Sequence, residues 1–324
     1  MDIKKYILWR IVSTILTFFV IATIVFFLFR MVGDPASLFM SPGMDGGQLE
    51  RIRASFGLDE PLYVQYYRYM VGLVTLDFGV SFYYRSPTGP IVIERMINSL
   101  FLTLPAILIA YIGGSIGGVL MAWKRGEPLE RMGLIGAVLF RSTPRFWLGI
   151  ILLFVFAGIL GWFPSFGMLP HDVEFRGHLY LLVEPSFYHR IVLPILSMTF
   201  YLMGLPLLLM RTSMLEVINQ DFVDVCRAKG LTETEVMYKH VARNALLPVV
   251  TAFAVGIAFS FGGNVLVETV FSYPGVGRLM VDSVFRSDYP VAQLAFLAMA
   301  AMVLFMNFIA DILYFYLDPR VKAE

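Results

Sequence analysis

The sequence is poor in cysteine and in charge, and each shortage excludes a class of protein. Its single cysteine, Cys226, cannot build an intramolecular disulfide framework or a cysteine-based zinc site. Charged residues make up 15% of the 324 residues, whereas soluble domains carry about 25%. The net charge of +1 leaves no basic stripe to neutralise phosphates, which argues against a nucleic-acid partner.

Apolar residues dominate the chain instead. They form 58% of it, and the mean hydropathy of +0.74 indicates a polytopic membrane protein. A helix needs about 20 apolar residues to cross the hydrocarbon core. The first apolar run is too long for a secretory signal and no small-residue cleavage site follows it, so we expect it to be retained. We expect six transmembrane helices, at 8–30, 99–123, 132–162, 191–211, 245–268 and 289–313.

The third expected span contains RSTPR, from Arg141 to Arg145, where Pro144 should kink the helix. Charged side chains are costly inside a bilayer and are functional candidates there. We expect Arg141 to extend towards the cytoplasmic boundary. Arg145 should either do the same or face a pathway between the spans.

The lysines predict the orientation. All of them fall in the two tails or in the second and fourth loops, which share one face of a six-span protein: Lys4, Lys5, Lys124, Lys229, Lys239 and Lys322. The positive-inside rule makes this face cytoplasmic, together with both termini. Residues 31–98, 163–190 and 269–288 are then external. The arginines are spread more evenly between the two faces.

This arrangement predicts that the chain has two parts. Residues 1–98 comprise the first span and a small external subdomain, with helical patterning near Gln48–Phe56 and Pro61–Leu73. Residues 99–324 form the transmembrane core.

The polar segment between the fourth and fifth spans predicts two short helices. The first should run from Met214 to Lys229 and end at Gly230 in a left-handed conformation. Thr232 and Glu235 fit a capping box that opens the second helix, which should end near Asn244.

This segment has an apolar tip within charges of both signs. The tip residues are Val225, Ala228 and Leu231, and the charged ones are Asp221, Asp224, Arg227, Lys229 and Glu233. Such a knob suits docking into a groove of a partner protein. It equally suits a solvated amphipathic loop, and the residues alone leave both interpretations open.

RAKGL (Arg227–Leu231) followed by RNALLPV (Arg243–Val249) resembles the cytoplasmic coupling loop of ABC-importer permeases, specifically their dipeptide and oligopeptide branch. Motifs similar to that branch follow one another along the chain: GDPA (Gly33–Ala36), FGLDEPLYVQYYRY (Phe56–Tyr69), DFGVSF (Asp77–Phe82), TPRFW (Thr143–Trp147), GWFPSFG (Gly161–Gly167), ETVFSYPGVGRL (Glu268–Leu279), SDYPV (Ser287–Val291) and DILYFYLDPR (Asp311–Arg320). Two departures stand out. Asp224-Val225-Cys226 replaces the usual Glu-Ala-Ala before the loop glycine, and Arg145 stands where the family more often has a small polar residue.

The resemblance implies an all-α, type I ABC importer (methionine-permease-like) transmembrane fold in the cell membrane, with residues 212–244 as the coupling loop. It also implies three kinds of partner: a second related permease, two ATPase subunits on the cytoplasmic face and an external solute-binding protein. The sequence has no G-x-x-x-x-G-K-[ST] phosphate loop, so ATP hydrolysis should belong to the partner subunits. We expect no enzymatic activity, cofactor or metal in this chain itself.

A second candidate site lies at the outer end of the fifth span, as an outer gate or part of the pathway. Its residues are Asn264, Glu268, Phe271, Tyr273, Pro274, Gly275 and Gly277. The proline and glycines should form a tight external turn. An alternative for Glu268 is an ion pair with Arg278 at a helix end. Asn307 and Asp311 are expected to bond a neighbouring helix.

Two further patterns have simpler explanations. Gly113-Gly114-Ser115-Ile116-Gly117 satisfies G-x-S-x-G, but no strand precedes it and no histidine lies in the six expected spans, so helix packing is expected. The external group of His171, Asp172, Glu174 and His178 matches no known metal-ligand spacing and should be a solvated loop.

Peptides are the expected substrates, with oligosaccharides or nickel chelates as alternatives. A different class, a stand-alone secondary transporter or channel, would predict inverted repeats, discontinuous spans or paired mid-membrane acids. The sequence shows none of these features.

Overall fold

The computed structural model describes residues 3–32, 58–260 and 264–317, together with Gly47, Glu50 and Ala54. The motif Gly33–Ala36, most of the expected helix near Gln48–Phe56, and the tail from Asp318 that contains Lys322 lie outside the described residues. Within the described ranges the chain is helical, with one isolated β-bridge between Val80 and Pro87. The predicted all-α class is confirmed.

In the part of the chain that the structure describes, four helices are long and apolar enough to cross a membrane unbroken: α1 (Ile3–Val32), α4 (Thr88–Trp123), α8 (Pro185–Val217) and α15 (Tyr289–Leu317). They correspond to the first, second, fourth and sixth expected spans. Two bent helix pairs bring the total to six if each pair counts as one span. α8 continues through two prolines, Pro194 and Pro206, and α4 through Pro105.

The third expected span is broken far more sharply than a kink. α5 (Pro128–Ser142) and the helix formed by α6 (Arg145–Leu152) and η2 (Leu153–Ile159) meet at 107°. Thr143 is extended (ψ 130°), because a residue before proline avoids helical geometry, and Pro144 then starts α6 (ψ 136°). The break falls at Pro144, as predicted, but it is sharper than the expected kink, since the second half turns away from the first.

The fifth expected span, 245–268, is also in pieces. α10 (Glu233–Glu235), η3 (Val236–Val241) and α11 (Ala242–Ala245) lead into α12 (Leu247–Ser260) with a bend of 48°. α13 (Val265–Val270) is a separate short helix beyond residues 261–263, which lie outside the description. Four further helices have their bounds within the described residues: α3 (Leu62–Thr75), which matches the helix expected at Pro61–Leu73, α7 (His178–Leu181), α9 (Asp221–Ala228) and α14 (Val276–Phe285).

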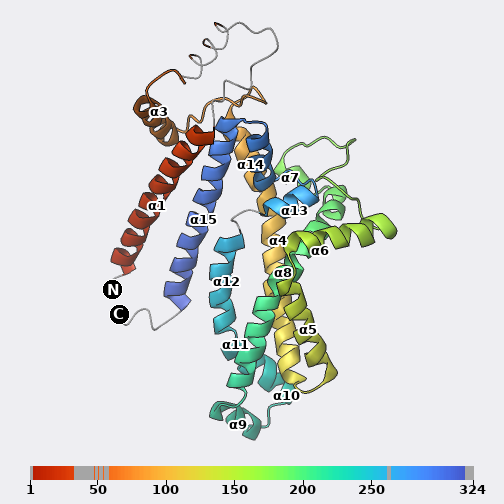
Figure 1. Ribbon diagram of the computed structural model, residues 1–324. Helices are drawn as coiled ribbons and strands as arrows, with labels where there is room; N and C mark the ends of the chain where they lie inside the picture. The colour runs from red at the N-terminus through yellow and green to blue at the C-terminus, as the bar shows by residue number, and fades with distance from the viewer. Residues whose placement is uncertain are drawn as a thin grey trace.

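The short helices gather at the two ends of the molecule. α7, α13 and α14 lie towards one end, and α9 and α10 lie at the other (Figure 1). The turn between α4 and α5, which carries Lys124, lies at the same end as α9. The arrangement therefore separates the two candidate sites by much of the length of α4 and α8.

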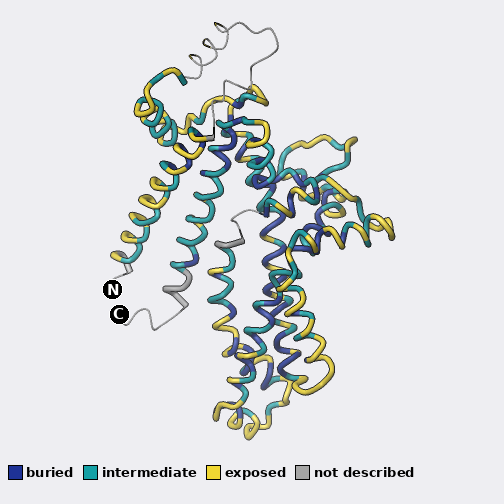
Figure 2. The backbone as a smooth tube through the Cα atoms, viewed as in Figure 1, coloured by how far each residue is buried: buried dark blue, intermediate teal, exposed yellow. Residues whose placement is uncertain are grey.

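The pair α4 and α8 forms the centre of the molecule. Gly114 and Gly118 let the two helices approach closely, because a Cβ on Gly118 would lie 2.6 Å from the Leu207 carbonyl oxygen. The Ser115 hydroxyl donates a hydrogen bond to the Tyr111 carbonyl. The G-x-S-x-G glycines thus serve helix packing, as expected. Buried backbone concentrates along this pair, whereas α9 and much of α1 are exposed (Figure 2).

Candidate functional site

The polar segment between α8 and α12 folds as two helices at one end of the molecule, although its first boundary differs from the expectation. Met214 belongs to α8, which ends at Val217, and α9 begins only at Asp221. Gln220 breaks the helix with an extended backbone (ψ 145°). The expected helix Met214–Lys229 was therefore wrong, and α9 is a separate, shorter helix that can point in its own direction.

The turn between α9 and α10 follows the prediction. Gly230 has φ +80°, a left-handed conformation that costs a residue with a Cβ about 1–2 kcal/mol. Thr232 accepts the backbone N–H of Glu235, and the Glu235 carboxylate accepts the N–H of Thr232, so the capping box is confirmed.

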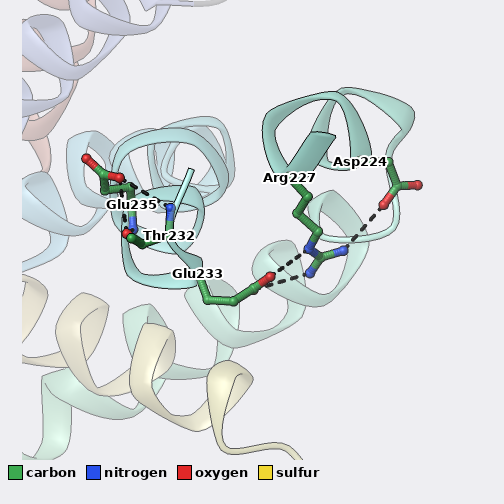
Figure 3. Close-up of polar contacts among 5 residues, drawn as sticks. All are labelled: Asp224, Arg227, Thr232, Glu233 and Glu235. Carbon is green, nitrogen blue, oxygen red and sulfur yellow. Dashed lines mark hydrogen bonds and ion pairs between the residues drawn. The ribbon is translucent and has the colours of Figure 1, made fainter. Parts of the chain in front are cut away.

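Arg227 ties the two helices together across this turn. Its Nε donates to Glu233 Oε1 at 2.9 Å, and it also contacts Asp224 (Figure 3). The hydrogen bond with Glu233 raises the pKa of the Arg227 guanidinium, so the cation is retained. These side chains are solvent-exposed, and such pairs contribute roughly 0–1 kcal/mol each. Their main effect is to orient the turn.

The outward face and the inward face of this element differ in character. Val225 is 52% exposed, and Ala228, Lys229 and Gly230 are exposed as well. Leu231, by contrast, is half-buried against the core beneath. The expected apolar tip is therefore formed by Val225 and Ala228, and Leu231 anchors it.

The base of the element is joined to the long helices by buried apolar contacts. Val223 and Val236 are fully buried and share one hydrophobic cluster with Met214 of α8 and Val119 of α4. Trp123, at the end of α4, packs on Tyr238. Because protein interiors are close-packed, a force on the exposed face would be transmitted to α4 and α8.

The second candidate site is built around a buried carboxylate at the opposite end. Glu268 is 1% exposed and accepts hydrogen bonds from the Ser99 hydroxyl at 2.6 Å and from the backbone N–H of Arg278 at 2.9 Å. Ser99 in turn accepts the N–H of Val276. The carboxylate thus caps the first turn of α14 and links it to α4.

The alternative of a side-chain ion pair between Glu268 and Arg278 was wrong. The Arg278 guanidinium pairs with Asp282 at 3.5 Å, on its own helix. Its backbone N–H, rather than its charge, satisfies Glu268.

The tight turn before α14 is fixed by α4. Asn98, which is fully buried, donates to the Pro274 carbonyl, and its own carbonyl accepts the Tyr273 hydroxyl at 2.8 Å. Phe271 is 3% exposed and packs against Gly149 of α6. Pro274 and Gly275 form a tight turn, as expected, and it is a buried connector between α4, α6 and α14. Gly277 was expected in the same turn but lies in the first turn of α14.

Sequence reasoning missed Asn98 and Ser99. The hydropathy pattern started the second span at residue 99 and assigned Asn98 to a loop, whereas α4 begins at Thr88. Two adjacent polar residues at the start of a long apolar run were the available signal.

A polar cluster surrounds the break between α5 and α6. Arg145 Nη1 donates to Asn264 Oδ1 at 2.9 Å, and Asn264 Nδ2 donates to Thr103 of α4. The guanidinium lies 4.3 Å from the ring centre of Tyr201 on α8, a cation–π distance. Asn264 is therefore buried, and its side chain contacts Arg145 and Thr103 and not the Glu268 carboxylate with which it was grouped. Arg141 is exposed.

Two other expectations concern isolated polar residues. Asp311 bonds a neighbouring helix, as expected, through an ion pair with Arg10 of α1. His171, Asp172 and Glu174 are exposed, but His178 bonds Asn98 and stacks on Phe101, so the solvated-loop description fails for His178. Among the described residues, no group of three potential ligands could hold a metal ion.

The comparison with known families agrees with this geometry. Residues 3–103 match the N-terminal region of the binding-protein-dependent transport system membrane component, and residues 114–323 match the binding-protein-dependent transport system inner membrane component. The chain belongs to this family of inner-membrane permeases, which operate with a solute-binding protein and ATPase subunits. It is a multi-pass membrane protein of a transport system.

Similar full-length relatives are the glutathione transport system permease proteins GsiC of Escherichia coli K12, Shigella dysenteriae and Salmonella paratyphi A. Each is 35% identical to this chain over 321 residues, which cover 99% of both proteins. The family assignment replaces the alternative of a stand-alone secondary transporter or channel with a subunit of a binding-protein-dependent transport system.

Proposed function

We propose that this chain is one of two related permease subunits that together form the pathway of an ATP-driven importer for peptides. The relatives named as glutathione permeases support a peptide-like substrate, because glutathione is itself a small peptide. Oligosaccharides and nickel chelates remain the alternative cargoes. Both termini face the cytoplasm in this proposal, as the lysine distribution predicts.

The observation that carries the proposal is the α9–α10 element. It combines an exposed face with a buried base that packs on both central helices. The face that contacts the ATPase comprises Asp221, Asp224, Arg227, Ala228, Lys229 and Gly230, with Leu231 holding it from beneath. ATP binding would move this element and, through its base, α4 and α8, which is the coupling that alternating access requires.

The turn from Phe271 to Gly277 serves as part of the outer gate in this proposal. It touches α4 through Asn98 and α6 through Phe271, so movement of either helix reaches it. A turn tied to α4 by hydrogen bonds suits a gate that moves as a unit with its helices.

Deletion of the gene for this chain, followed by uptake assays with labelled dipeptide, glutathione, oligosaccharide and nickel, tests the function directly. We expect loss of peptide uptake and its restoration by the intact chain. Affinity purification of the restored protein should recover a second permease and an ATPase with a phosphate loop. Unchanged peptide uptake with loss of sugar or nickel uptake would refute the peptide assignment, and purification without an ATPase would refute the coupling role.

A further inference from the structure

Arg145 is a charged side chain set deep among the helices. α5 has 15 residues, so Arg145 lies about 22 Å along the helix axis from the start of α5. The hydrocarbon core is only about 30 Å thick. α5 runs alongside α8 over this length (Figure 1). With the start of α5 at the cytoplasmic boundary, as the proposed topology requires, Arg145 lies within the span, where an arginine requires a specific reason.

Neutral groups hold the guanidinium in place. Asn264 accepts one hydrogen bond from it, and the face of Tyr201 lies against it. Thr103 fixes the Asn264 amide in turn. Within the described ranges, no carboxylate forms an ion pair with Arg145. The positive charge is positioned but not neutralised by this part of the chain.

Some hydrogen-bond donors of the guanidinium are not used by the described residues. The side chain can donate five hydrogen bonds, and the bond to Asn264 is the one that the described residues accept from it. Arg145 is half-buried, so the described residues leave part of the side chain uncovered. A rigid guanidinium with free donors is the group best suited to bind a carboxylate through two parallel hydrogen bonds.

We propose that Arg145 binds a free carboxylate of the transported peptide and selects substrates that carry one. The inference rests on the proposed peptide-import function and adds a specificity-determining residue to it. Tyr201 and Asn264 are positioning residues, which keep the guanidinium in the orientation that meets the carboxylate. Arg145 is the first residue of α6, directly after the break between α5 and α6.

The test uses the complete reconstituted importer and its binding protein. Uptake of a dipeptide is compared with uptake of the same dipeptide as its C-terminal amide, each at saturating loaded binding protein. For the wild type we expect the acid to be transported faster. The Arg145→Gln variant loses a charge-assisted hydrogen-bonded contact, so we expect it to transport the acid about tenfold more slowly than the wild type does. Its transport of the amide should be unchanged. Arg145→Lys should recover part of the preference.

Arg141→Gln is the matched control, because it removes a positive charge from an exposed position four residues earlier. It should leave the ratio of acid to amide transport at the wild-type value. Equal losses for both peptides in Arg145→Gln would assign Arg145 a structural role only and overturn the inference, as would an unchanged ratio. A wild-type importer that transports neither peptide would instead refute the proposed function, and the inference with it.

Discussion

Glu268 and Gly275 are packed so closely that no side chain fits between them. A Cβ on Gly275 would lie 2.3 Å from the carboxylate carbon of Glu268, which is buried and bonded to Ser99 and to the start of α14. The glycine is therefore required by the buried carboxylate. Its own backbone (φ −92°) would accept any residue.

Gly275→Ala should consequently destabilise the permease by about 1–3 kcal/mol through overpacking. Thermal unfolding of the purified complex in detergent measures this. Gly136→Ala is the control, since nothing lies within 4 Å of its added Cβ and the helix favours alanine. If the clash is with the carboxylate, Glu268→Ala and Gly275→Ala will be less than additive. An unchanged unfolding temperature for Gly275→Ala would contradict the packing account.

The gate proposal makes a separate prediction at the same glycine. A bulky substitution, Gly275→Val, should lower transport per assembled complex, because the turn from Phe271 to Gly277 then can no longer move as a rigid part of the mouth. Assembly is checked by co-purification with the partner subunits. Wild-type transport by assembled Gly275→Val complexes would contradict the gate role and leave this turn as a structural connector between helices.

Gly230→Val tests the coupling element. Gly230 has φ +80° and open space around it, so the cost comes from the backbone alone, about 1–2 kcal/mol, and more for a β-branched residue. Relaxation of this strain would change the angle between α9 and α10. We expect the variant to remain in the membrane but to bind the ATPase less well, or to lose the link between hydrolysis and uptake.

Gly126 provides a control matched in backbone conformation. It has φ +87°, likewise with nothing near its Cβ, in the turn between α4 and α5 at the same end of the molecule. Gly126→Val should suffer similar strain and still retain the ATPase. Co-purification of the ATPase and substrate-stimulated hydrolysis are the measurements. Wild-type behaviour of Gly230→Val in both assays would disprove the docking role of the α9–α10 element.

The charged residues of the same element should differ in importance. Asp224→Ala removes an exposed charge whose contact with Arg227 is long, 3.4 Å, so its effect should be within about 1 kcal/mol. Arg227→Gln should weaken ATPase association more, since Arg227 connects α9 to Glu233 beyond the turn. A titration of ATPase against the immobilised permease would rank the two variants. A larger effect from Asp224→Ala would show that Arg227 does not orient the turn.

Orientation is tested by cysteine labelling after Cys226 has been replaced by alanine. Lys239→Cys and His171→Cys place single thiols at exposed positions near α10 and in the loop before α7. An impermeant thiol reagent added to intact cells should label position 171 and spare position 239, and both should react in opened membranes. Labelling at 239 from outside would reverse the proposed topology.

The sequence by itself determined the class of the protein and several local structures. Long apolar runs have no stable alternative to membrane helices, because every backbone group must be satisfied within lipid. Gly230 and the Thr232–Glu235 capping box were predictable because they depend on residues within one turn of each other. Family motifs spread along the whole chain indicated the permease, and the family match supports them.

The tertiary structure decided which polar groups meet. Asn98 and Ser99 lie far along the chain from the turn that they fix: Asn98 and Pro274 are separated by 176 positions, and Ser99 and Glu268 by 169. No local sequence pattern could therefore pair them. Pro144 signalled a break, but its 107° angle depends on how α6 packs across α8 and α13. The same packing sets Arg145 against Tyr201 and Asn264. Local propensity fixes where a membrane helix ends, whereas long-range contacts fix where the next one goes.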